Sequence, residues 1–179
     1  MTMQSALVDD FVDKEIVRAV KTLTESDSPK TVSSSALKIA TAFGADRKAL
    51  AVPAPGSEDK LVKSFNSNLT LLIQKTWVEK SDSELKEQVL YQLGQFCEDI
   101  KTKSWADSYT PFLDIIYNAV YLMFGTQTKS DDFLEYAFRI DPEFGIFWFY
   151  IQSLPHETSW SDEKCRIAVL LGMYFLANY

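Results

Sequence analysis

Cysteine, histidine, glycine and proline are all scarce in this chain of 179 residues. The two cysteines, Cys97 and Cys165, are too few for a disulfide scaffold, and their spacing matches no zinc motif. The single histidine, His156, forms no local nucleophile-base signature and cannot supply the two Glu-x-x-His motifs of a di-iron bundle. Six glycines and six prolines are too few for a turn-rich β-sandwich. We therefore expect no metal site and no disulfide framework.

Motifs of catalysis are missing as well. The chain has no glycine-rich phosphate loop, no G-x-S-x-G and no H-E-x-x-H. Carboxylate pairs at helical spacing occur, but each lies near a predicted helix start, where negative charge stabilises the helix dipole. We predict no catalytic residue and no cofactor, and we expect a protein that is not an enzyme.

The sequence also lacks a long hydrophobic run and a targeting signal. Its start, MTMQSALVDDFVDKE, carries three aspartates and no basic segment before an apolar one, so we expect no signal or transit peptide. The longest nearly apolar run, residues 167–177, would form a helix of about 17 Å, too short for a hydrocarbon core of about 30 Å. We expect this run to be a buried helix, with no membrane span, in a cytoplasmic protein.

Positive charge is in the minority and is unevenly distributed. The formal net charge is −7, but residues 29–80 hold eight Lys and Arg against four Asp and Glu. We do not expect nucleic acid as a partner of so acidic a chain. The basic segment is either an ordinary solvated surface or a local site for an acidic partner, and its candidate residues are Arg47, Lys48, Lys60 and Lys63.

Apolar residues are abundant, at 46%, and recur with helical spacing almost throughout. No segment alternates with period two for long enough to be a strand. The pattern predicts an all-α fold of about eight helices, arranged as antiparallel hairpins in a bundle or a short repeat-like array. We expect the second helix to begin at the serines 33–35, the stretch TQTKS to be a loop, and capping residues at Ser81, Ser104, Asp141 and either Ser159 or Ser161.

The clearest linker is VPAPGS, residues 52–57, because two prolines and a glycine cannot continue a helix. We predict one helical domain over residues 1–179. A sub-boundary at this linker would separate an N-terminal helical hairpin, 1–51, from a main helical array, 58–179.

The stretch YAFRIDPEFGIFWFY, residues 136–150, has Asp-Pro followed by a tryptophan six residues on. It resembles the junction between two tetratricopeptide repeats, which has an alanine, a spaced apolar residue, Asp-Pro and a tryptophan that opens the next helix. The matching residues are Ala137, Ile140, Asp141, Pro142 and Trp148, with Tyr121 and Gly125 upstream. The resemblance covers about residues 111–152, and no 34-residue period recurs elsewhere, so a generic helical bundle stays the alternative.

Aromatic residues are the richest feature of the C-terminal third. They cover most of the circumference of the helix predicted after Pro142, so this helix is either buried on nearly every side or exposed to a partner. Our leading hypothesis is a protein-interaction or scaffold module that binds another protein, or a second copy of itself, by helix packing. The alternative is a small-molecule or lipid-binding domain with the same aromatics as its pocket. The candidate anchors are Phe147, Trp148, Phe149 and Tyr150.

Overall fold

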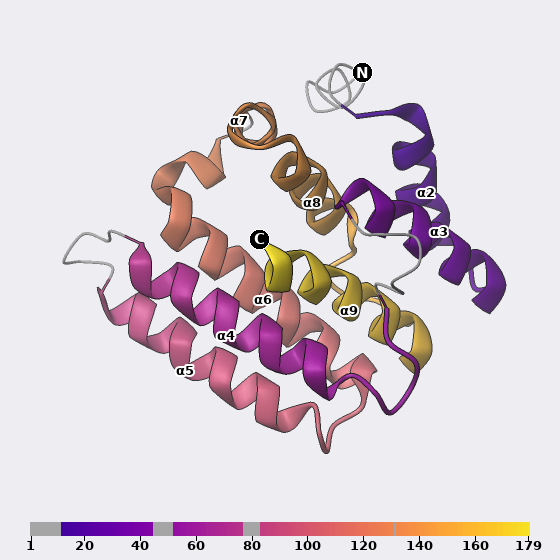
Figure 1. Cartoon of the computed structure of the whole chain (residues 1–179), viewed down its shortest axis with the longest axis horizontal. Coiled ribbons are helices and arrows are strands. Elements are labelled where there is room, and N and C mark those ends of the chain that lie inside the picture. The colour runs from indigo at the N-terminus through magenta and orange to yellow at the C-terminus, as the bar shows by residue number, and fades with distance from the viewer. Residues whose placement is uncertain (1–11, 45–51, 77–82, 131) are drawn as a thin grey trace.

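The structure is a computed structural model that describes residues 12–44, 52–76, 83–130 and 132–179. Within these residues the fold is all-α, with eight α-helices and no strand (Figure 1). The elements are α2 (Lys14–Glu25), α3 (Pro29–Ala42), α4 (Asp59–Lys75), α5 (Ser83–Asp99), α6 (Trp105–Phe124), the 3-10 helix η2 (Gly125–Lys129), α7 (Phe133–Ile140), α8 (Pro142–Ser153) and α9 (Asp162–Asn178).

Side-chain caps fix where several of these helices begin. The side chain of Ser104 accepts a hydrogen bond from the amide of Asp107, and that of Ser161 accepts one from Lys164. Asp141 caps α8 in the same way, and Pro142 follows at the first helical position, where its missing amide costs no hydrogen bond. These three predicted caps are therefore confirmed. Ser81 lies outside the described residues.

Two predicted boundaries are wrong. Helix α3 begins at Pro29, after Ser28, and not at the serines 33–35, which lie inside the helix. The start is set by Pro29, whose fixed φ suits the first turn, while Val32, Ala36 and Ile39 face the core along α3. The stretch TQTKS is not an open loop, because Gly125–Lys129 forms the 3-10 helix η2 after α6.

Helix α9, the last in the chain, is the centre of the fold. Figure 1 shows it in the middle of the molecule, with α4, α5 and α6 on one side and α2, α3, α7 and α8 on the other. It packs directly against α3, α4, α6 and α8. Consecutive helices also pack as pairs, namely α2 with α3, α4 with α5, α5 with α6, and α7 with α8. The last helix thereby packs against helices from both halves of the described chain.

The core explains why α9 is nearly apolar on all sides. Every residue of α9 from Lys164 to Met173 is buried. Aromatic rings of α8 and α9 meet face to face, since Phe147 stacks on Phe175 with ring centroids 4.4 Å apart. The hydroxyl of Tyr150 donates to the backbone carbonyl of Ala168 at 2.8 Å, so this buried polar group is satisfied. Among the described residues, none of the helices is both long enough and apolar enough to cross a membrane.

Candidate functional site

The structure buries the four aromatic residues of α8 that were candidate anchors. Phe147 and Tyr150 are 0% exposed, Trp148 is 2% exposed and Phe149 is 8% exposed. The physical reason is that α8 is enclosed by α7, α9 and α2, so its apolar circumference is covered by the chain itself. In this conformation these side chains form core, and a partner surface has to be made by other residues.

The basic candidates lie elsewhere. Lys60 and Lys63 are exposed on α4, and the Lys63 ammonium lies 2.9 Å from the carboxylate of Asp59 one turn earlier. Exposed ion pairs of this kind contribute little to stability. Arg47 and Lys48 lie outside the described residues. The structure therefore does not bring the two placed lysines together with the aromatic residues of α8.

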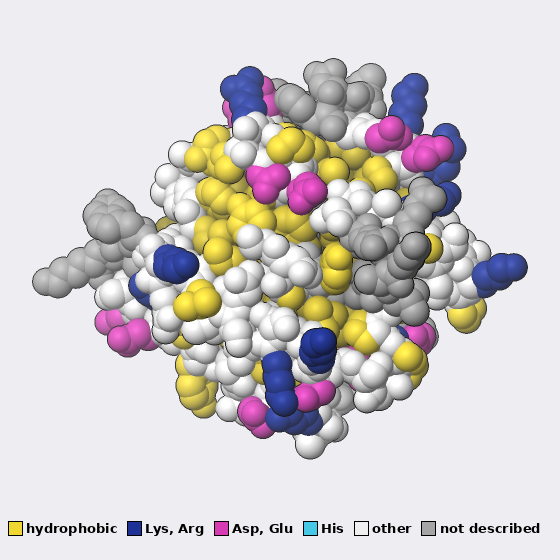
Figure 2. All heavy atoms as spheres, viewed as in Figure 1, with side chains coloured by type: hydrophobic (Ala, Val, Ile, Leu, Met, Phe, Trp, Pro, Cys, Tyr) yellow, Lys and Arg dark blue, Asp and Glu magenta, His cyan; other side chains and the backbone are white. Residues whose placement is uncertain are grey.

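Few large hydrophobic side chains reach the surface in the described part of the chain. Figure 2 shows hydrophobic side chains gathered in the upper part of one face, where α7 and the C-terminus lie. The exposed contributors near there are Tyr136, Ile140 and Tyr179, which are 37%, 45% and 39% exposed. Tyr91 on α5 is far more exposed, at 72%. Its ring offers apolar area and its hydroxyl a polar tip, a combination that tyrosine brings to many protein interfaces.

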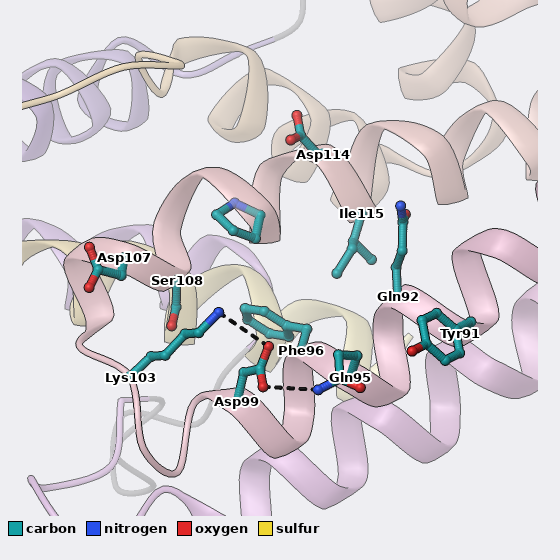
Figure 3. Close-up of a pocket in the computed structure, with 11 residues that line it drawn as sticks. Tyr91, Gln92, Gln95, Phe96, Asp99, Lys103, Asp107, Ser108, Asp114 and Ile115 are labelled. Atoms are coloured by element: carbon teal, nitrogen blue, oxygen red, sulfur yellow. Dashed lines mark hydrogen bonds and ion pairs between the residues drawn. The ribbon is translucent and has the colours of Figure 1, made fainter.

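Tyr91 lies at one end of a groove between α5 and the first half of α6, which we call the α5–α6 groove (Figure 3). Its volume is about 250 Å³. Phe96 and Ile115 supply apolar lining from the two helices. Pro111 of α6 also lines it, and because proline has no amide, the carbonyl of Asp107 loses the hydrogen bond it would receive from residue 111.

The polar lining of the α5–α6 groove is mainly acidic. Three aspartates line it, Asp99, Asp107 and Asp114, against one cation, Lys103. Figure 3 shows Asp99 between Lys103 and Gln95, whose atoms lie 3.4 Å and 3.0 Å from its carboxylate. The carboxylate of Asp114 lies 3.6 Å from Nε2 of His156. Three carboxylates and one ammonium give the described lining a formal charge of −2.

A second candidate site is a hollow of about 470 Å³ beside Trp148, which we call the Trp148 hollow. The indole ring of Trp148 stands edge-on to the rings of Tyr117 and Phe133, with centroids 5.4 Å and 5.2 Å away. Its Nε1 is the one buried side-chain nitrogen or oxygen in the described residues without a hydrogen-bond partner. Burial raises the pKa of Tyr117, which lines the hollow with Tyr121. Lys129 Nζ lies 5.1 Å from the centre of the Tyr121 ring.

Helix α5 carries a signal for the α5–α6 groove in its own residue pattern. The apolar stripe of α5 runs through Val89, Leu93 and Phe96, and Tyr91 falls off this stripe. An aromatic residue on the polar side of an amphipathic helix leaves apolar area in solvent, which a partner could cover. The groove itself could not be predicted from the sequence, because its lining comes from two helices that meet only in the folded protein.

Comparisons of this chain with protein-family models, with curated proteins and with solved structures find no match.

Proposed function

We propose that this protein is a non-enzymatic interaction module that binds a basic segment of a partner protein in the α5–α6 groove. The observation that carries the proposal is Tyr91, 72% exposed at the end of a groove with an apolar lining and a formal charge of −2. The two cysteines are free and buried, which suits the cytoplasm, where we propose that the protein acts.

The groove has the parts of a small helix-packing or peptide-binding site. Apolar side chains of the partner would pack on Phe96 and Ile115, with Tyr91 as a rigid aromatic anchor at the edge. Lysine or arginine side chains of the partner would face Asp107 and Asp114, and the acidic body of the chain would speed their approach. The freed carbonyl of Asp107 offers one further acceptor for a donor.

The test is binding of fluorescent peptides from a library that varies in net charge, measured by anisotropy at two salt concentrations. We expect amphipathic peptides rich in lysine and arginine to bind, and their affinity to fall as salt rises. Tyr91→Ala should weaken binding by roughly 10-fold, in the range for an aromatic anchor. Leu71→Ala is the matched control, because Leu71 is an exposed large hydrophobic residue, at 50%, that does not line the groove.

Charge is tested separately. Asp107→Asn together with Asp114→Asn should weaken binding and flatten its salt dependence, whereas Glu87→Gln, an exposed carboxylate on α5 outside the groove, should change neither. Equal loss in Tyr91→Ala and Leu71→Ala, or stronger binding of acidic peptides, would overturn the proposal. Molar mass in solution, measured on the same samples, shows whether the partner is a second copy of the chain.

The unpaired indole of Trp148 favours a second candidate function, which is binding of a small amphipathic molecule in the Trp148 hollow. Among the described residues, the lining combines aromatic rings with one cation, Lys129, and no carboxylate, which suits a flat apolar body that carries an acidic group. The probe is 2-naphthoate, followed by the indole ¹H–¹⁵N signals of the tryptophans. Binding that shifts the Trp148 signal and weakens in Lys129→Gln supports this function, and unchanged spectra at millimolar probe exclude it.

A further inference from the structure

A third concave surface, between α2 and α3, has the opposite charge to the α5–α6 groove. This α2–α3 hollow has a volume of about 330 Å³. Three cations line it, Arg18 from α2 and Lys30 and Lys38 from α3, against one carboxylate, Glu15. None of the three cations forms an ion pair or a side-chain hydrogen bond with any residue that the structure describes. In a chain of net charge −7, this hollow is a local excess of unpaired positive charge.

Antiparallel packing sets the order of these groups. Arg18 lies in the middle of α2, and Lys30 and Lys38 are eight residues apart on α3, about 12 Å along the helix axis. Long side chains at that spacing can both reach an anion that lies between them. Ser34 and Ser35 lie midway between the two lysines in sequence, and both line the hollow.

The hollow also contains hydroxyl groups that are not engaged by the helix backbone. Some helical hydroxyls elsewhere donate to the carbonyl one turn earlier, as Thr41 does to Leu37 and Ser153 does to Phe149. Ser35 is only 6% exposed as a residue, and its hydroxyl forms no hydrogen bond within the described part of the chain. Its oxygen is not shut off from solvent, so it is open to a group that enters the hollow. Ser34 and Thr31, which also line the hollow, form no side-chain hydrogen bond either. A ligand that accepts hydrogen bonds would therefore find free donors here.

We propose that the α2–α3 hollow binds a phosphate monoester. Its doubly charged head has oxygens enough to accept from the Arg18 guanidinium and from the hydroxyls of Ser34 and Ser35 together. Lys30 and Lys38 then balance the second negative charge from either side. Glu15 lies in the first turn of α2, at the far side of the hollow from Thr22. Its negative charge disfavours an anion there, which places the phosphate nearer the middle of the hollow.

The binding test uses inorganic phosphate, titrated into ¹⁵N-labelled protein in chloride buffer at constant ionic strength. We expect amide signals from Ser34 to Lys38 to shift and to saturate. Arg18→Gln should raise the dissociation constant by roughly 10-fold, and Ser35→Ala by roughly threefold, as for a charged and a neutral hydrogen bond. Lys21→Gln is the matched control, since Lys21 is an exposed cation on α2 that does not line the hollow.

Vesicles distinguish a soluble ligand from a lipid headgroup. Phosphatidylcholine vesicles with and without phosphatidic acid, which carries a phosphate monoester, are sedimented with the protein. Binding that needs phosphatidic acid and is displaced by inorganic phosphate assigns the site to a headgroup, whereas saturable phosphate binding with no vesicle binding assigns it to a soluble ligand. If the amide signals do not shift at phosphate concentrations up to about 20 mM, which is about 20 times a millimolar dissociation constant, the proposal is overturned. Equal weakening by Lys21→Gln and Arg18→Gln overturns it as well, because it shows a general charge effect.

Discussion

Arg166 of α9 donates a hydrogen bond from Nε to Oε1 of Glu58, across 2.8 Å and 108 positions of sequence. The two side chains are 5% and 16% exposed, so the pair is largely removed from water. Arg166 also donates to Glu163 and to the backbone carbonyl of Pro53. These hydrogen bonds connect α9 to residues 53–58, the segment that leads into α4.

Arg166→Met removes the cation and leaves the carboxylate of Glu58 in a site with little water. We expect a loss of about 3 kcal/mol in the free energy of unfolding, because breaking a buried pair leaves an uncompensated charge. Glu58→Met combined with Arg166→Met should recover part of it. Arg139→Met is the control, since Arg139 pairs with Glu135 at the surface and should cost less than about 1 kcal/mol. Urea unfolding is measured for the wild type and these three variants, and equal losses in Arg166→Met and Arg139→Met would contradict the structural role of the pair.

The same pair predicts a dependence of stability on pH. Burial by itself raises the pKa of Glu58, but the hydrogen bond from Arg166 and those of the backbone outweigh it, so the pKa lies below its ordinary value of 4.5. A carboxyl whose pKa is lower when folded stabilises the fold above its unfolded pKa, and this contribution is lost as pH falls through the folded pKa. Unfolding free energy should therefore drop on acidification below about pH 4.5, and less steeply in Glu58→Gln. If unfolding free energy falls equally steeply with pH in the wild type and in Glu58→Gln, the lowered pKa of Glu58 is contradicted.

Two glycines in helices should respond to alanine in opposite directions. A Cβ at Gly145 of α8 would overlap the ring of Phe138 in α7, so Gly145→Ala should cost about 1–3 kcal/mol by overpacking. Nothing lies within 4 Å of a Cβ at Gly94 of α5, so Gly94→Ala should stabilise by about 0.5–1 kcal/mol through helix propensity. Thermal unfolding measures both, and destabilisation by Gly94→Ala would show that α5 does not hold this position as an open helical site.

Both cysteines should be slow to react with thiol reagents while the protein is folded. Burial raises the pKa of the Cys97 thiol to about 11, and it also raises the pKa of Cys165. Because the thiolate is the nucleophile, and because both side chains are buried, labelling by dithionitrobenzoate at pH 8 should be far slower than in urea. Labelling of Cys97 at the rate of an unfolded thiol would show that α5 opens readily from α6.

The features that could be predicted from sequence are the local ones. The caps at Ser104 and Asp141 were readable because a cap is a hydrogen bond within one turn of helix. Local rules failed at the serines 33–35, because serine favours a cap by itself, while Pro29 and the core-facing residues of α3 had already set the helix start. The likeness to a tetratricopeptide junction stays a prediction, since capping by Asp141 and burial of Ala137 also occur in other helical hairpins.

The non-local features could not be predicted, for a physical reason. An all-round apolar helix such as α8 has the same sequence whether its own chain or a partner covers it, and α9, which packs against it, comes later in the chain. The α5–α6 groove likewise joins Tyr91 to Asp107 and Pro111, which only the packing of two helices brings together. Ser35 is informative only once its place in the α2–α3 hollow is known.

Substitution of Trp148 tests whether the aromatic side chains of α8 belong to the core of the protein or to an interface with a partner. Its burial predicts that Trp148→Ala lowers the free energy of unfolding by about 3–5 kcal/mol, through the lost apolar area and the cavity left behind. Trp148→Phe should cost less, because it keeps an aromatic ring between Tyr117 and Phe133 and removes the unpaired indole N–H. Chemical unfolding and molar mass in solution are measured on each variant. If Trp148→Ala stays as stable as the wild type while an oligomer becomes a monomer, the indole is an interface residue, because a core residue of this volume cannot be truncated without loss of stability.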